Sequence, residues 1–109
     1  MEAEEFQKAL ILFLIYGIKD YENSFYLYRA LERMFDIYDY STVINDLIID
    51  NFLERSIVNN VDHHNLTDKG VELLNSNEAI FIEELQKRYL PLQPEYIKNI
   101  LAYTGKSNY

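Results

Sequence analysis

The chain has 109 residues, of which 49% are apolar and 26% charged, and its 18 acidic and 10 basic residues give a net charge of -8. This composition is too apolar for a disordered chain, and the length suits one small domain with a modest core. The acidity argues against a free-standing basic nucleic-acid binder, because neutralising phosphates requires clustered Lys and Arg. The absence of Cys excludes disulfides, thiolate metal sites and cysteine nucleophiles, and it fits a reducing cytoplasm.

The most apolar segment, Ala9–Ile18, predicts a buried core helix rather than a membrane span. Its 10 residues are about half of the ~20 needed to cross a bilayer. Glu2, Glu4 and Glu5 stand ahead of it, where a signal peptide would need a basic region. We therefore expect no membrane contact and a cytoplasmic location.

Three helices are predicted in the first half of the chain, at 4–16, 24–35 and 41–52. The first is apolar nearly all round, which is typical of a central buried helix, and its acids lie at the N-terminal end, where the helix dipole favours them. Asn23 or Ser24 is expected to cap the second helix, and Asp39 or Ser41 the third.

The third predicted helix has an inner and an outer face at helical spacing. The inner face is expected to carry Val43, Ile44, Leu47, Ile48 and Phe52. The outer face is expected to carry Thr42, Asn45, Asp46 and Ile49, with Asp50 beside them.

Two short strands, 53–58 and 61–66, are predicted to form a hairpin around Asn59 and Asn60, because Asn tolerates the left-handed backbone of such a turn. Thr67 is expected to cap a following helix that ends at 75–77. Two more helices are predicted at 79–89 and 95–103, with Pro94 at the first helical position. Residues 104–109 are expected to fray.

Two segments of the sequence resemble parts of a winged helix-turn-helix domain. Residues 41–51 followed by Phe52–Arg55 are similar to the third helix and first wing strand of such a domain. Leu66–Gly70 with Val71–Leu74 resembles the strand-to-helix phrase that follows the wing in regulators of the MarR and PadR type. Within this phrase, Thr67 can cap the helix, and Gly70 suits a close approach of a neighbouring segment.

The resemblance covers about 9–74 and implies a mainly α fold with a small β-hairpin. We assign 1–76 to the winged-helix domain and 77–109 to a C-terminal helical extension of the same compact domain. A generic small α-helical domain is the alternative, because the matching phrases are short.

The resemblance implies a protein of the transcriptional-regulator type that reads DNA through helix 41–52 and hairpin 53–66. The DNA-contact candidates are Thr42, Asn45, Arg29, Arg33, Arg55, Asn59 and Asn60. Four acids and no base lie between Asp39 and Glu54, however, and Arg55 is the only Lys or Arg of the hairpin. An acidic module of the same fold that binds a protein instead of DNA is therefore the alternative hypothesis.

The two C-terminal helices are the candidates for a homodimer interface, as the resemblance implies for regulators with added terminal helices. The apolar candidates are Phe81, Ile82, Leu85, Tyr89, Tyr96, Ile97, Ile100 and Leu101. The alternative is that these side chains close over the first helix of the same chain.

No motif predicts an enzyme, a metal site or a cofactor. His63 and His64 are neighbours in a predicted strand and point to opposite faces, so they do not readily share a metal. Asp46 and Asp50 share one helix face, which is typical of a solvated acidic surface rather than of acid–base chemistry. The three glycines are too far apart for a phosphate loop.

Overall fold

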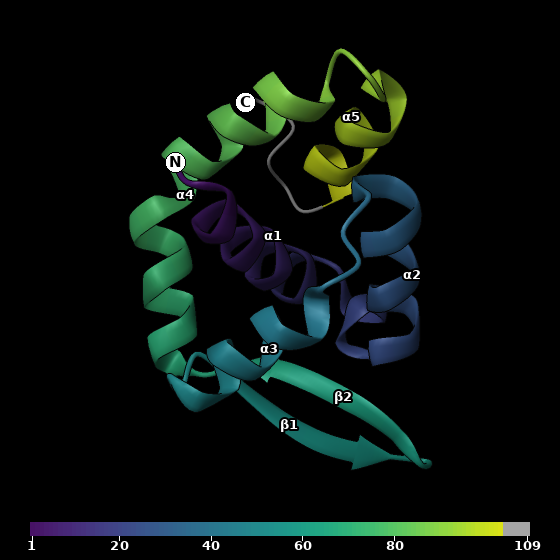
Figure 1. Ribbon diagram of the computed structural model, residues 1–109, viewed down its shortest axis with the longest axis vertical. Coiled ribbons are helices and arrows are strands. Elements are labelled where there is room, and N and C mark those ends of the chain that lie inside the picture. Colours follow the sequence, from purple (N-terminus) through teal and green to yellow (C-terminus); the bar gives the residue numbers. More distant parts are fainter. Residues whose placement is uncertain (104–109) are drawn as a thin grey trace.

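The computed structural model describes residues 1–103, which form five α-helices, a short 3₁₀-helix and a two-stranded antiparallel hairpin (Figure 1). The elements in chain order are α1 (Ala3–Gly17), η1 (Lys19–Glu22), α2 (Ser24–Phe35), α3 (Tyr40–Ile49), β1 (Leu53–Val58), β2 (Val61–Leu66), α4 (Asp68–Tyr89) and α5 (Pro94–Tyr103). The predicted mainly α fold with a small hairpin is confirmed. The prediction of a frayed tail at 104–109 lies outside the described residues.

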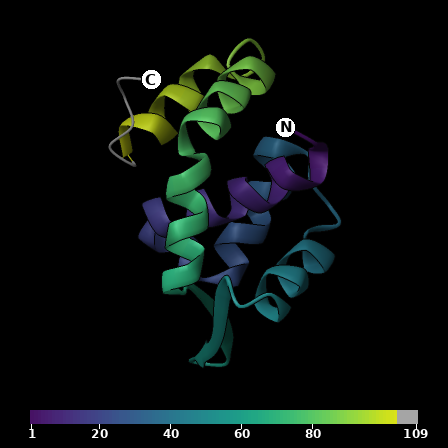
Figure 2. The ribbon, with the colours of Figure 1, turned by 90° about the vertical axis from the view of Figure 1, so that its left-hand side faces the viewer.

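Helix α1 runs through the middle of the molecule and the other helices surround it (Figures 1 and 2). Every residue from Ala9 to Ile15 is buried, as is Phe6. This agrees with the prediction of a central buried helix. Within residues 1–103, no helix has both the length and the apolar character that a membrane span requires.

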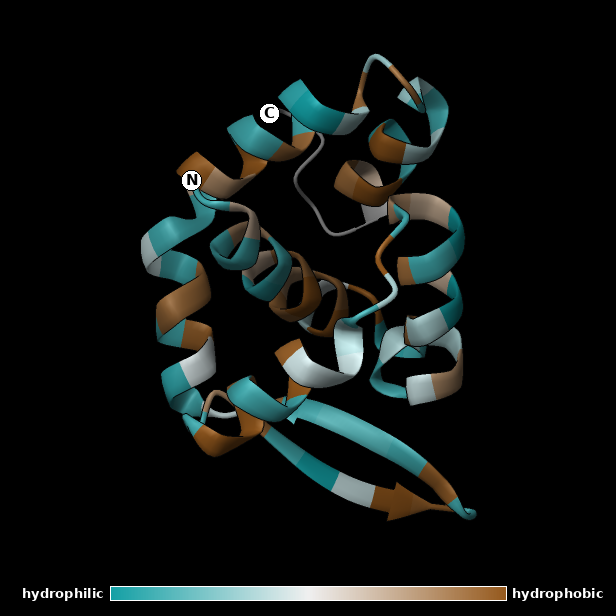
Figure 3. Cartoon of the chain, in the orientation of Figure 1, coloured by the Kyte–Doolittle hydropathy of each residue, from teal (hydrophilic) through white to brown (hydrophobic). Residues whose placement is uncertain are grey.

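The hairpin pairs β1 with β2 in a regular antiparallel register from Leu53 opposite Leu66 to Val58 opposite Val61. Asn59 and Asn60 both have positive φ, 51° and 66°, which is the geometry of a type I′ turn. The hairpin predicted from these two residues is therefore confirmed. Its strands are largely hydrophilic, and apolar residues gather at its tip (Figure 3).

Helix α4 is one continuous helix of 22 residues, so the predicted break at 75–77 is wrong. Ser76 and Asn77 donate side-chain hydrogen bonds to the carbonyls of Glu72 and Leu73, four residues earlier. Such back-bonding lets polar residues remain inside a helix and often bends it. The helix does bend along its length (Figure 1), and the boundary expected between 76 and 77 falls inside it.

The C-terminal half of α4 and helix α5 pack onto their own chain. Six of the eight dimer-interface candidates are at most 3% exposed and belong to the single hydrophobic core: Phe81, Ile82, Leu85, Ile97, Ile100 and Leu101. Phe81 contacts the rings of Phe6 and Phe13 of α1, with centroid distances of 5.5 and 5.1 Å. These six side chains are thus covered by their own chain and are not free to form a dimer interface. The homodimer remains a prediction.

The other two candidates, Tyr89 and Tyr96, are half-buried beside α2. The Tyr89 hydroxyl donates to the carbonyl of Phe35 over 3.1 Å, and the Gln93 amide donates to the carbonyl of Met34 over 2.6 Å. These carbonyls belong to the last turn of α2, where no intrahelical donor is left for them. The junction between α4 and α5 therefore caps α2.

Candidate functional site

Helix α3 presents a polar face to solvent beside the hairpin. Val43, Ile44 and Leu47 are buried, whereas Thr42 and Asn45 are exposed. Ile49 is 78% exposed, as the helical spacing predicted. Two details of the prediction are wrong. Ile48 was expected on the inner face and Asp46 on the outer face, but both side chains are half-buried.

The helix also ends three residues earlier than predicted, at Ile49. Asn51 has a positive φ of 66°, which a right-handed helix does not allow. Phe52 consequently lies outside the helix, where it packs against the core from the start of the hairpin.

The start of α4 holds the end of α3 through a set of hydrogen bonds. Thr67 caps α4, because its hydroxyl oxygen accepts from the Gly70 amide over 3.0 Å. The same hydroxyl donates to the Asn51 carbonyl over 2.6 Å, and the Lys69 ammonium donates to the Asp50 carbonyl over 2.9 Å. The Lys69 ammonium also lies 4.7 Å from the centre of the Phe52 ring, a favourable cation–π contact.

Gly70 is buried against the backbone of Phe52. A Cβ atom at Gly70 would overlap the Phe52 carbonyl oxygen, which already accepts a hydrogen bond from the Thr67 amide. Only glycine fits without a shift of one of the two segments. The predicted roles of Thr67 as cap and of Gly70 as the site of close approach are both confirmed.

The hairpin turns one face toward the helices. Leu53, Arg55, Ile57, Asp62, His64 and Leu66 share that face, because opposite residues of an antiparallel pair lie on the same side and alternate residues of a strand do too. Leu53 and His64 are each 1% exposed. Burial lowers the pKa of His64, which the nearby Asp62 carboxylate partly offsets, so the neutral ring is the favoured form.

A polar pocket of about 200 Å³ lies between α2, α3 and this face of the hairpin. Its walls are Tyr28 of α2, Ser41, Ile44, Asn45 and Ile48 of α3, and Arg55, Asp62 and His64 of the hairpin. Two of the predicted DNA-contact residues, Asn45 and Arg55, are thus brought together around one pocket. Sequence reasoning missed Tyr28, Asp62 and His64, although inward-pointing Leu66 places Asp62 and His64 on its own face by strand alternation.

The remaining DNA-contact candidates are exposed but do not converge. Arg29 lies over the ring of its helix neighbour Phe25, with the guanidinium carbon 5.7 Å from the ring centre. Arg33 is exposed near the other end of α2, and Asn59 and Asn60 form the hairpin tip. These side chains therefore do not form the continuous row of cations that binding to a DNA backbone would need.

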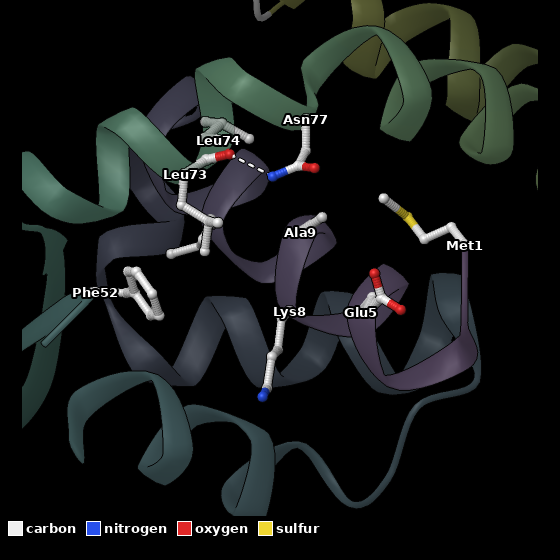
Figure 4. A pocket seen from close by; sticks show the side chains of 9 residues that line it. Met1, Glu5, Lys8, Ala9, Phe52, Leu73, Leu74 and Asn77 are labelled. Carbon is white, nitrogen blue, oxygen red and sulfur yellow. Dashed lines mark hydrogen bonds between the residues drawn. The ribbon is translucent and has the colours of Figure 1, made fainter. Parts of the chain in front are cut away.

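A second, apolar pocket of about 240 Å³ lies between α1 and α4 and reaches Phe52 (Figure 4). Ala9, Leu12, Leu73 and Leu74 supply most of its apolar wall. Lys8 stands at one side but pairs with Glu4 over 3.4 Å. The Asn77 amide is likewise engaged, by the Leu73 carbonyl.

Within residues 1–103, no cluster of three or more His, Asp or Glu side chains has an arrangement that could hold a metal ion. Comparison with protein-family models, with curated proteins and with solved structures gives no match.

Proposed function

We propose that this chain is a winged helix-turn-helix protein that binds a protein partner, and not DNA, through its α3–hairpin surface. We define this surface as the exposed side chains of residues 41–65: Ser41, Thr42, Asn45, Ile49, Asp50, Asn51, Glu54, Arg55, Ser56, Ile57, Val58, Asn59, Asn60 and Asn65. The winged-helix assignment is supported by the element order of three helices, an antiparallel hairpin and a further helix. It is also supported by the tight junction of Phe52 with Thr67 and Gly70, which gives the resembling phrases a physical role.

The observation that carries the proposal is the combination of acidic and apolar side chains on this surface. Ile49, Ile57 and Val58 are 78%, 68% and 45% exposed. Between residues 39 and 66 the sequence has five acids against one Lys or Arg, which is Arg55. Exposed aliphatic side chains among carboxylates suit an interface with a protein, since apolar contacts give affinity and complementary charges guide the encounter.

The same observation weighs against DNA. Binding to a duplex requires several cations on the surface that faces the phosphates, and each contact releases bound counterions. Here Asp50 and Glu54 are exposed on that surface, and the Lys69 ammonium is already bound to the Asp50 carbonyl. A partner that carries Lys or Arg beside apolar side chains matches the surface in charge and in polarity.

The test is to select binders from a phage-displayed library of random peptides and to measure the best of them as synthetic peptides by fluorescence polarisation. We expect the selected peptides to combine Lys or Arg with aliphatic or aromatic residues. The triple variant Asp46→Asn, Asp50→Asn, Glu54→Gln is expected to weaken their binding by about tenfold or more, because it removes two carboxylates of the surface and the half-buried Asp46 carboxylate beside them.

The matched control is Glu72→Gln, Glu83→Gln, Glu95→Gln, which removes the same charge from exposed positions of α4 and α5. It should leave the affinity within about twofold. Equal weakening by both triple variants would show that net charge alone drives binding, which contradicts a defined surface. Peptides that lack basic residues would contradict the proposed partner chemistry.

A further inference from the structure

The polar pocket between α2, α3 and the hairpin has the size and the lining of a small-molecule site. Its volume of about 200 Å³ exceeds the ~150 Å³ of a cavity that holds a benzene molecule. Six of its lining side chains carry polar groups: Tyr28, Ser41, Asn45, Arg55, Asp62 and His64. A site with convergent polar groups from three different elements is typical of ligand recognition.

One of these groups is buried without a partner. His64 is 1% exposed, and its Nδ1 atom makes no hydrogen bond. Buried polar atoms are hydrogen-bonded in the great majority of cases, because an unmade bond leaves the cost of desolvation uncompensated. His64 also belongs to the pocket wall, so its ring lies next to any ligand that enters the pocket.

Two further groups carry opposite charges and stay apart. Arg55 lies directly opposite His64 in the register, and Asp62 lies two residues from His64 on the same strand face. Both are close enough to influence the titration of His64 and of Tyr28. Within the described chain, however, the two charges form no ion pair or hydrogen bond with each other or with any other side chain.

We infer that this pocket binds a small zwitterion of the amino-acid type. The Arg55 guanidinium matches the carboxylate of such a ligand, and the Asp62 carboxylate matches its ammonium group. Tyr28, Ser41, Asn45 and the imidazole of His64 provide hydrogen-bonding groups for the rest of the molecule. The inference does not rest on the proposed protein partner, although Ser41, Asn45 and Arg55 belong both to the pocket wall and to the α3–hairpin surface.

The experiment is a thermal-unfolding screen of the full chain against the common free amino acids at 10 mM, with propionate and propylamine as single-charge probes. A bound zwitterion at about ten times its Kd should raise Tm by about 4 °C or more. The best ligand is then titrated calorimetrically and followed by NMR. On binding, the ring signals of His64 should shift and those of His63, which points to the other hairpin face, should stay in place.

Two variants remove one charge each: Arg55→Gln and Asp62→Asn should each weaken the Kd by about tenfold or more. Two neighbours on the opposite hairpin face are matched controls: Glu54→Gln and His63→Asn should keep the Kd within about twofold. The inference is overturned if no amino acid raises Tm, or if propionate or propylamine raises it equally. It is also overturned if both charge-removing variants, shown to be folded by circular dichroism, bind like the wild type.

Discussion

Helix α4 holds the C-terminus of another helix at each of its ends, and the two ends do so with different chemistry. At its start, Thr67 and Lys69 bind the Asn51 and Asp50 carbonyls just beyond α3. At its end, Tyr89 and the following Gln93 bind the last carbonyls of α2. The partners in the first contact are separated by 16 and 19 positions in the sequence, whereas those in the second are separated by 54 and 59 positions.

The difference shows which parts of the molecule depend on each contact. The start of α4 fixes the angle between α3 and the hairpin, and therefore the proposed binding surface. The end of α4 anchors α5 and completes the core around α1. Substitutions at the first contact should disturb the surface, and substitutions at the second should cost stability while leaving the surface intact.

The largest effect is expected from Gly70→Ala. The new methyl group would meet the Phe52 carbonyl oxygen, and we expect a loss of about 2–3 kcal/mol, at the upper end of the range for overpacking. Urea unfolding measures it. The control Asn75→Ala, at an exposed position of the same helix, should change stability by less than about 0.5 kcal/mol. A Gly70→Ala protein as stable as the wild type would refute the tight junction.

The next effect is expected from Thr67→Ala, which removes both the cap of α4 and the hydrogen bond to Asn51. We expect a loss of about 1–2 kcal/mol, together with shifted amide signals along α3 and the hairpin in a ¹H–¹⁵N NMR spectrum. Thr67→Ser keeps the hydroxyl and should behave almost like the wild type. If the two variants were equally destabilised, the hydroxyl would not be the cause.

A smaller loss, about 1 kcal/mol each, is expected from Gln93→Ala and Tyr89→Phe. Both remove a donor to the last turn of α2 and leave the core side chains in place. The amide signals of α3 and the hairpin should not move in either variant. Shifts there comparable with those of Thr67→Ala would contradict the separation between the two ends of α4.

The smallest expected effect is a pH dependence from His64. Burial lowers its pKa in the folded chain, so below about pH 6.5 the unfolded chain binds a proton that the folded chain resists. Stability should therefore fall as the pH drops from 7 toward 5. His64→Phe should flatten this fall in Tm and His63→Asn should preserve it; the opposite pattern would place the titrating group elsewhere.

Local motifs predicted the cap and the close approach at the start of α4, but not its hydrogen bonds to the Asn51 and Asp50 carbonyls, and nothing of the contact at its end. Thr67 and Gly70 have roles that follow from capping and close approach, and Asn59 and Asn60 define their turn without help from the rest of the chain. The partners of Tyr89 and Gln93 depend on the tertiary path of α2, which spacing does not reveal. Apolar spacing likewise identified Phe81 and Leu85 as contact residues without telling a self-contact from a contact with a second copy.

Polar residues inside a helix led to the prediction of a helix end that does not exist. Ser76 and Asn77 suggested a break, yet their side chains bond back to the preceding turn and α4 continues. The pocket around His64 was missed because the two adjacent histidines were not considered together with the other residues on each strand face. The register that places Asp62, His64 and Leu66 on one face was available from strand alternation alone.

The central claim is that the α3–hairpin surface binds a protein partner and not DNA. Its most direct test is a fluorescence-polarisation titration of the full chain against mixed-sequence duplex DNA. The titration is done at ~50 mM salt, because contacts with phosphates are stronger at low salt. We expect no binding up to protein concentrations of about 10 μM, because residues 39–66, which contain this surface, have five acids against a single Arg and no Lys. Binding that falls steeply with added salt and is lost in Arg55→Gln would contradict it.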